Sequence, residues 1–306
     1  MAQPSFDPGL TRQYGGKLGR SIDARGRFNV LRSGFGLRDT GVYLFLMNRS
    51  WFTFFAIVGA AYLVVNLLFA LVYYAIGVDT LQGAHAAEPL RGFLDAFFFS
   101  VQTFTTVGYG HMAPNTPLSS FVAAMEALSG LLGFAVGTGL LWGRFSKPSA
   151  CLVFSDRILV APYQGGLSLQ FRVANRRPNV LMEIEAKMLM MTVEGEGAAL
   201  RRDFVDLKLE VPSVYFLPLT WTLVHKIDET SPFWGMTAQD LAGRQLQMLI
   251  LLKAFDDTFS QTVHGRFSYT HEEFVWNARF VRSFDVNDQG ALVLHMSRVS
   301  QYEVLA

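Results

Sequence analysis

The stretch Thr106-Val107-Gly108-Tyr109-Gly110 decides how this chain is interpreted, because it lies between two long apolar segments. A row of backbone carbonyls can face one axis only if alternate residues adopt conformations that most L-residues avoid. Gly108 and Gly110 adopt them without steric cost. Rings of such carbonyls replace the hydration shell of K⁺. One chain cannot enclose an ion in this way, so the stretch predicts four copies around an axis. The alternative is a Gly-Tyr-Gly turn in an ordinary loop.

The apolar residues of the 306-residue chain are concentrated in two segments that predict membrane spans. Residues 51–76 contain no Lys, Arg, Asp or Glu, and residues 117–142 contain only Glu126. Both are long enough to cross a hydrocarbon layer of about 30 Å. The apolar stretch 92–103 between them is only about three turns long, which suits a re-entrant helix buried in protein. The near-zero net charge gives no basic excess, which argues against nucleic-acid binding.

The distribution of cations predicts the orientation of the spans. The first 50 residues contain eight Arg or Lys residues, Arg144 and Lys147 follow the second span, and Arg91 is the only such cation between the spans. By the positive-inside rule, both termini are cytoplasmic and the Thr106–Gly110 stretch faces outward. We therefore expect a multi-pass protein of the bacterial inner (plasma) membrane.

The stretch before the first span favours a helix in the cytoplasmic interface. Residues 42–47 are apolar and lie between Arg38-Asp39 and Asn48-Arg49. The alternative, that they form the inner end of the first span, would make that span too long without extreme tilt.

The second span contains Gly130, Gly133, Gly137 and Gly139. Such small residues predict close helix packing, a bend at a glycine when a pore opens, or both. Phe134 and Trp142 are eight residues apart and so share a face within roughly 80°. Repeated four times, that face would form aromatic rings that constrict a pore by excluding water. The alternative is that both rings pack against lipid or the first span.

Glu126 lies inside the second span, where an acidic group costs about 2.5–3.5 kcal/mol on insertion scales. It should therefore face protein or water. Its position, nine residues into the span, places it level with the Thr106–Gly110 stretch. We expect it to form hydrogen bonds behind this stretch rather than to bind permeant ions.

After about residue 149 the pattern changes to short runs typical of strands, separated by turns. They predict an all-β sandwich of about 150 residues with one short helix at 237–241. The expected runs are 151–154, 167–171, 182–186, 188–191, 204–209, 247–252 and 291–294.

Three further motifs give the chain a specific resemblance. The segment 221–232, WTLVHKIDETSP, resembles the "T-x-V-H-x-I-D-x-x-S-P" motif of the prokaryotic inward-rectifier potassium channels, the KirBac family. Residues 267–276, FSYTHEEFVW, are similar to the family's "SY-x-x-(D/E)-E-I-x-W" segment, with Phe274 in place of Ile. Residues 144–148, RFSKP, match the basic link after its inner helix. The similarity covers roughly residues 38–296.

The resemblance implies a fold class of two-transmembrane-helix pore with a re-entrant pore helix, joined to a cytoplasmic immunoglobulin-like β-sandwich. It also implies a homotetramer that conducts K⁺, a potassium-selective inward-rectifier-type channel without cofactors. The K⁺ ligands would come from Thr106, Val107, Gly108 and Tyr109. The predicted segments are a tail at 1–37, an interfacial (slide) helix at 38–50, a pore domain at 51–146 and the sandwich at 147–306. Within the pore domain we expect an outer helix at 51–76, a pore helix at 92–104, the filter at 106–110 and an inner helix at 117–145.

The resemblance also assigns roles to charged residues. Glu185, Asp256 and Asp257 would form acidic rings in a cytoplasmic vestibule and offer a site for polyamines or Mg²⁺; the alternative is that they are solvated surface carboxylates. Phe134 lies where eukaryotic relatives often carry a polar or acidic residue, which puts strong rectification in doubt. Trp142 matches the bulky residue at the bundle crossing.

Arg49, Arg144 and Lys147 would bind an anionic lipid headgroup, each contributing about 1 kcal/mol near a charged surface. The positive-inside rule alone would also place cations at these positions. His111 follows the filter where many potassium channels have Asp, and either tunes the charge of the outer mouth with pH or is a bystander.

Other classes of protein receive less support. The six histidines show no i, i+4 pair, and no glycine-rich phosphate loop lies outside the spans, so we do not expect an enzyme. A non-conducting membrane-anchored sensor would not need the Thr106–Gly110 stretch. A potassium channel gated by a small cytoplasmic ligand such as a nucleotide should contain an Arg-bearing phosphate cassette, and none is present.

Overall fold

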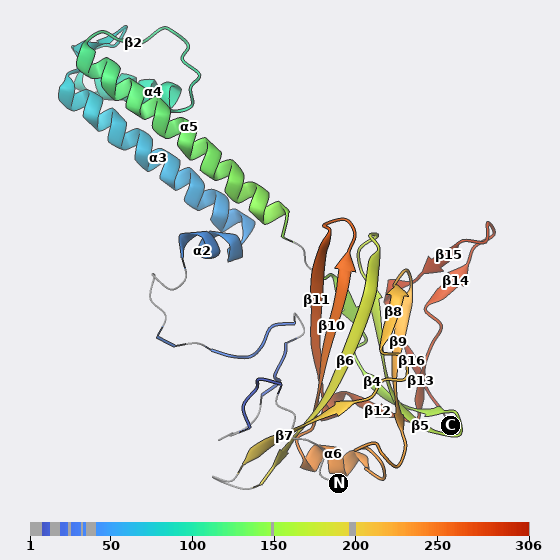
Figure 1. Ribbon diagram of the computed structural model, residues 1–306. Coiled ribbons are helices and arrows are strands. Elements are labelled where there is room, and N and C mark those ends of the chain that lie inside the picture. Colours follow the sequence, from blue (N-terminus) through green and yellow to red (C-terminus); the bar gives the residue numbers. More distant parts are fainter. Residues whose placement is uncertain are drawn as a thin grey trace. The chain divides into compact units, whose positions relative to one another are not determined.

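The structure is a computed structural model that describes residues 8–12, 19–23, 26–31, 33–34, 41–147, 150–195 and 200–305. The chain forms two units (Figure 1). Residues 32–147 form one, here called the helical unit, and residues 1–31 with 148–306 form the other, here called the β domain.

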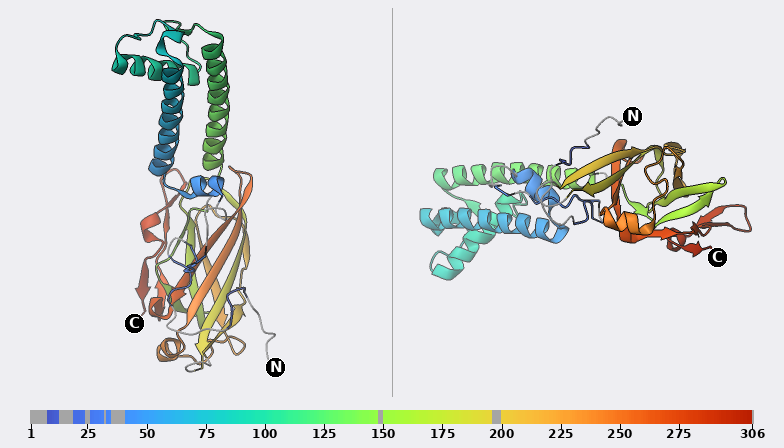
Figure 2. Two further views of the ribbon diagram at one scale, coloured as in Figure 1. Left: turned by 90° about the vertical axis from the view of Figure 1, so that its left-hand side faces the viewer. Right: turned by 90° about the horizontal axis from the view of Figure 1, so that it is seen from below.

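The helical unit contains the two helices that are long and apolar enough to cross a membrane, α3 (Trp51–Ile76) and α5 (Pro117–Phe145). They lie side by side with α4 (Pro89–Phe104) across one end (Figure 2). The short helix α2 (Val42–Asn48) precedes α3. A 3₁₀ turn (Val78–Thr80) and the paired strands β1 (Leu81–Gln82) and β2 (Ala113–Pro114) frame α4.

Local capping explains where the long helices begin. Ser50 accepts a hydrogen bond from the Thr53 amide at the start of α3. Thr116 and Ser119 form a reciprocal capping box before α5, whose first residue is Pro117. The helix α4 begins at Pro89, three residues before the expected start of the pore helix at 92, because proline is tolerated at a first helical position. The interfacial helix covers residues 42–48 of the expected 38–50; residues 38–40 lie outside the described residues.

The β domain is a sandwich of two five-stranded sheets. One has the order β11-β10-β6-β7 with β8 on β6, and the other has the order β12-β4-β5-β3 with β9 on β5. Every pairing is antiparallel except β12 with β4. The strands are β3 (Leu152–Phe154), β4 (Ile158–Tyr163), β5 (Gly166–Asn175), β6 (Leu181–Glu194), β7 (Arg201–Leu207), β8 (Ser213–Phe216), β9 (Thr220–Ile227), β10 (Gln247–Asp256), β11 (Gln261–Thr270) and β12 (Phe274–Trp276).

The remaining elements of the β domain are small. Two antiparallel pairs follow the sandwich, β13 (Ala278–Phe280) with β16 (Tyr302–Val304) and, between them in the chain, β14 (Phe284–Val286) with β15 (Leu292–Leu294). The helix α6 (Ala238–Gly243) is capped by Thr237, close to the expected position. The two expected runs at 182–186 and 188–191 are one continuous strand, β6, because Lys187 takes its turn on the exposed side of the alternation.

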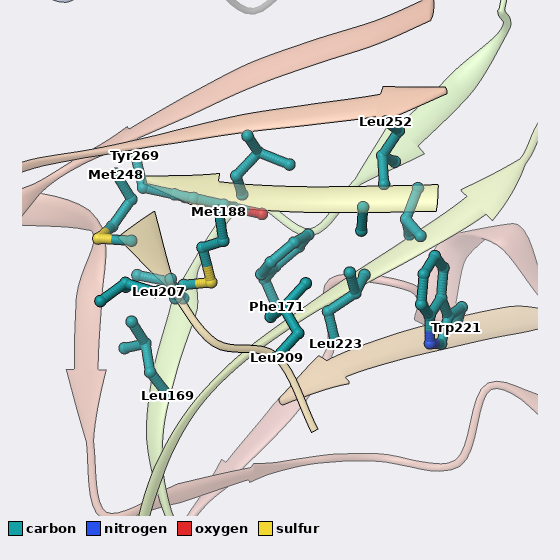
Figure 3. Packing of buried hydrophobic residues seen from close by; sticks show 14 of the residues in the cluster. Leu169, Phe171, Met188, Leu207, Leu209, Trp221, Leu223, Met248, Leu252 and Tyr269 are labelled. Atoms are coloured by element: carbon teal, nitrogen blue, oxygen red, sulfur yellow. The ribbon is translucent and has the colours of Figure 1, made fainter. Parts of the chain in front are cut away.

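The core of the β domain lies between the two sheets (Figure 3). Phe171 and Leu223 of one sheet point toward Met188, Met248 and Tyr269 of the other, and all are buried. His225 of the 221–232 motif has a structural role, because its Nδ1 lies 2.8 Å from the Lys208 carbonyl oxygen and its Nε2 lies 2.8 Å from Ser231 Oγ.

The N-terminal segment packs on the β domain rather than forming a free tail. Ile22 is buried in a second apolar cluster with Met191, Phe204 and Leu249. Arg20 forms an ion pair with Glu273 at 2.8 Å. The expected tail at 1–37 is thus attached to the β domain at Arg20 and Ile22, and Leu10 packs on the same apolar cluster.

Candidate ion-conduction site

The Thr106–Gly110 stretch follows the end of α4 and alternates in backbone conformation. The φ angles of Thr106, Gly108 and Gly110 are 59°, 52° and 80°. The amides of Val107 and Gly108 donate to the Gln102 carbonyl at 3.0 and 3.4 Å, which ties the stretch back to α4. Left-handed residues at every second position are the condition for carbonyls of successive residues to face one side.

Thr106 was not expected to share this conformation. A positive φ is a strained state for a β-branched residue. The residue type alone predicts the opposite, so no signal in the sequence other than the motif itself could have found it. Such strain is maintained where the surrounding structure fixes the backbone, and here the fixed element is the last turn of α4.

Behind this stretch, Glu126 is fully buried among three helices. Its Oε2 accepts a hydrogen bond from Tyr73 of α3 at 2.7 Å, and Ser100 of α4 hydrogen-bonds to its Oε1. Ser100 also lies within hydrogen-bond distance of Asn66 on α3. Asn66, Tyr73 and Ser100 are missing from the predicted site, because only the fold brings them to Glu126.

The glycines of α5 differ in what surrounds them. A β-carbon added at Gly130 would overlap the Phe104 carbonyl oxygen at the end of α4. At Gly133 it would make an ordinary contact with the Phe104 ring at 3.5 Å. At Gly137 and Gly139 it would meet nothing within 4 Å in the described chain. Gly130 therefore serves close packing, whereas Gly137 and Gly139 lie on a part of the helix surface that no other atom of the described chain contacts.

Phe134 and Trp142 both lie on a face of α5 that nothing in the described helical unit covers. Phe134 is 75% exposed and Trp142 is 73% exposed. Neither ring packs against α3, so of the alternatives to a pore-lining role only packing against lipid remains.

The end of α5 is tied to α2 through Arg144. Its guanidinium donates to the carbonyls of Leu46 and Arg49, the latter at 2.8 Å, and lies over the rings of Trp51 and Phe54. The Lys147 ammonium donates to Asn48 at 3.0 Å. Arg144 thus satisfies backbone carbonyls at the end of α2, where the helix dipole favours positive charge, and Lys147 bonds the side chain of the last residue of that helix.

The basic residues expected at the membrane border are thus not equivalent. Arg144 is half-buried, whereas Arg49 and Lys147 are exposed. The Arg49 guanidinium lies over the Phe45 ring, 4.3 Å from its centre.

The three acidic residues expected in a vestibule also differ from one another. Glu185 is exposed and lies 3.8 Å from the Lys253 ammonium on the neighbouring strand. Asp257 is exposed in the hairpin turn between β10 and β11.

Asp256 is only 1% exposed and corrects the prediction. Its carboxylate accepts from the amides of Thr258 and Phe259 and from the Asn179 side chain. The Asp256 carboxylate is thus buried and bonded to the turn and to Asn179, whereas an acidic ring around a vestibule requires carboxylates that face solvent.

Beside α4, His85 forms a contact that the sequence did not indicate. Its backbone amide and its Nδ1 both approach Asp95 Oδ2, at 2.8 and 2.9 Å. His111 is exposed beyond the Thr106–Gly110 stretch. Within the described residues, no three His, Cys, Asp or Glu side chains are grouped as a metal site would require.

Comparison with known proteins agrees with this arrangement. A family model described as "Inward rectifier potassium channel C-terminal domain" matches residues 152–305, and one described as "Ion channel" matches residues 61–146. The chain is 35% identical over 283 residues to the inward rectifier potassium channel Kirbac3.1 of Paramagnetospirillum magnetotacticum, covering 91% of this chain and 94% of that protein.

More distant similarity extends to animal proteins. The chain is 29% identical over 248 residues to the ATP-sensitive inward rectifier potassium channel 12 of Bos taurus, covering 75% of this chain and 58% of that protein. It is 27% identical over 292 residues to the G protein-activated inward rectifier potassium channel 3 of Mus musculus, covering 88% and 74%. With its two spans and its all-β second domain, the chain belongs to the inward-rectifier potassium channels, as a prokaryotic-type membrane channel rather than an enzyme.

Proposed function

We propose that four copies of this chain surround one conduction pathway, with K⁺ bound by Thr106, Val107, Gly108 and Tyr109 of each copy. The observation that carries this proposal is the left-handed backbone at Thr106, Gly108 and Gly110. One chain supplies one wall of carbonyls, and an ion stripped of water needs oxygens on all sides. Four walls complete the shell, and Glu126 fixes α4 from behind.

Phe134 and Trp142 form hydrophobic constrictions below the filter. Their exposure in one chain supports this, since large aromatic side chains left bare on a spanning helix find cover in lipid, in a neighbouring copy or at a pore axis. Opening moves the lower half of α5 outward, and the bend lies at Gly137 or Gly139, where the helix surface is unobstructed.

Anionic lipid headgroups bind at Arg49 and Lys147, with Arg144 holding α2 in place for them. The three residues form one basic group around the end of α2. A headgroup phosphate that draws Lys147 away from Asn48 loosens the link between α2 and α5. Lipid binding and the position of α5 are therefore coupled.

Glu185 and Asp257 line a cytoplasmic continuation of the pore, concentrate cations and bind polyamines or Mg²⁺. The protein acts in the bacterial inner membrane with both termini in the cytoplasm, as the cations that flank the spans support.

The test is ⁸⁶Rb⁺ uptake into proteoliposomes that contain the purified protein. We expect uptake that Ba²⁺ blocks and that external K⁺, but not Na⁺, competes away. Uptake without preference for K⁺ would refute the filter. Absence of uptake in lipid mixtures both with and without anionic lipid would favour a non-conducting role.

A further inference from the structure

Four buried polar side chains meet between α3, α4 and α5, and their protons can be counted. Tyr73 donates to Glu126 Oε2 at 2.7 Å. Ser100 Oγ is hydrogen-bonded to Glu126 Oε1 and lies 3.2 Å from Asn66 Oδ1 and 3.1 Å from the Asn66 carbonyl oxygen. The Asn66 amide nitrogen donates to the Tyr62 carbonyl at 2.8 Å, so its side-chain oxygen is the atom that faces Ser100.

The Ser100 hydroxyl has one proton but contacts acceptors on two sides. If Glu126 is ionised, that proton goes to Glu126, and the Asn66 side-chain oxygen faces the hydroxyl without a proton between them. If Glu126 Oε1 carries a proton, it donates to Ser100 Oγ and Ser100 donates to Asn66. Each of the four side chains then has a partner, as buried polar groups in native proteins generally do.

The surroundings of Glu126 agree with the neutral form. Both spans lie wholly within the described residues, and no Lys, Arg or His of that part of the chain forms an ion pair with Glu126. A carboxylate buried in a span without a cation has only the Tyr73 and Ser100 hydroxyls to stabilise its charge.

We infer that Glu126 is a neutral carboxylic acid that donates its proton to Ser100. The resulting series of hydrogen bonds, Glu126–Ser100–Asn66, positions the pore helix. Ser100 lies two residues before Gln102, whose carbonyl accepts from the amides of Val107 and Gly108. This series of hydrogen bonds therefore fixes the turn of α4 to which the filter is hydrogen-bonded. Tyr73, Ser100 and Asn66 are positioning residues and contact no ion. The link to ion selectivity rests on the proposed function, but the protonation of Glu126 does not.

The protonation is tested by infrared spectroscopy of the full-length protein in lipid. The spectrum of the wild type minus that of Glu126→Gln should show the C=O stretch of a protonated carboxylic acid. Its frequency should shift in Ser100→Ala, where the acid loses the acceptor of its proton. A carboxylate band in place of the acid band would overturn the inference, whether or not the protein conducts.

The positioning role is tested by the ratio of Rb⁺ to Na⁺ uptake. Glutamine has the shape of neutral glutamic acid, with an N–H donor for Ser100 and an oxygen for Tyr73, so Glu126→Gln should keep the ratio within about twofold. Ser100→Ala and Tyr73→Phe should lower it by roughly fivefold or more, the effect of one buried hydrogen bond. Ser129→Ala is the matched control, because Ser129 donates only to the Met125 carbonyl on the exposed side of α5.

The two variants at Glu126 and Ser100 separate the outcomes. If Glu126→Gln loses selectivity as severely as Ser100→Ala, a negative charge is required and the inference is wrong. If Ser100→Ala and Tyr73→Phe keep the wild-type ratio of Rb⁺ to Na⁺ uptake, the hydrogen bonds between Glu126, Ser100 and Asn66 do not position the filter. Failure of the wild type to conduct would refute the proposed function and leave the infrared result standing.

Discussion

Replacing Gly130 by alanine tests how closely the inner helix must approach the filter. The added β-carbon would overlap the Phe104 carbonyl oxygen and lie 2.8 Å from its carbonyl carbon. Carbon atoms pack at about 3.5–4.0 Å, so α4 and α5 must separate by at least roughly 0.7 Å. Neither atom belongs to a flexible side chain that could turn away. Phe104 lies two residues before Thr106, so the displacement reaches the filter directly.

The energies make the sign of the effect clear. Overpacking of this kind costs about 1–3 kcal/mol, and the better helix propensity of alanine returns at most about 1 kcal/mol. Gly137→Ala gains the same propensity without the clash, because nothing lies within 4 Å of the added atom. We expect Gly130→Ala to lower stability and uptake, and Gly137→Ala to keep or raise stability.

Two measurements on each variant separate the effects. Thermal unfolding of the purified channel reports stability, and Rb⁺ uptake with and without competing Na⁺ reports selective conduction. A fall in uptake for Gly137→Ala with increased stability would identify Gly137 as the bend. Wild-type stability and uptake for Gly130→Ala would refute the close-packing argument, since no relaxation of side chains alone could accommodate the new atom.

Three further predictions concern the β domain. Arg20→Gln removes the half-buried ion pair to Glu273, and we expect roughly fivefold faster amide exchange at residues 19–23, a change of about 1 kcal/mol. Unchanged exchange would mean that the ion pair does not help to anchor the segment. Burial holds the pKa of His225 below its ordinary value. The neutral His225 therefore contributes its full stabilisation above about pH 6.5, and this contribution declines as the pH falls below that value. The stability of a His225→Gln variant should depend less on pH between pH 8 and 5, and a pH dependence identical to that of the wild type would contradict this. Asp257→Asn should weaken polyamine block, whereas Asp256→Asn should leave block unchanged and lower stability by about 1–2 kcal/mol. Weaker block in an Asp256→Asn variant of full stability would show that Asp256, not only Asp257, faces the pore.

The features that could be predicted from the sequence are those encoded in contiguous residues. Both spans follow from length and composition, and the filter from its motif. The position of Glu126 in the span was enough to predict burial, but not its partners, because Tyr73 and Ser100 lie 53 and 26 residues away along the chain. Only the packing of three helices determines that they meet.

Adjacent residues show a second limit. Asp256 and Asp257 are indistinguishable by composition, yet one is buried and the other exposed. The register of the β10–β11 hairpin decides between them, because the pairing ends at Asp256–Gln261 and the turn folds back over Asp256. The polar composition of the N-terminal segment gave no indication that Ile22 anchors it. That role depends on an apolar cluster formed by Met191, Phe204 and Leu249.

The packing of the N-terminal segment has a consequence for how this protein can be divided. The β domain is completed by residues from both ends of the chain, and the helical unit is an insertion between them. A fragment that starts at residue 148 would expose the apolar cluster of Met191, Phe204 and Leu249 to water. It would also leave Glu273 without its ion-pair partner, Arg20. Excising the helical unit and joining residue 31 to residue 150 with a flexible linker would keep both. The β domain is thus discontinuous in sequence, and an isolated version of it needs both segments joined by a linker rather than a simple truncation.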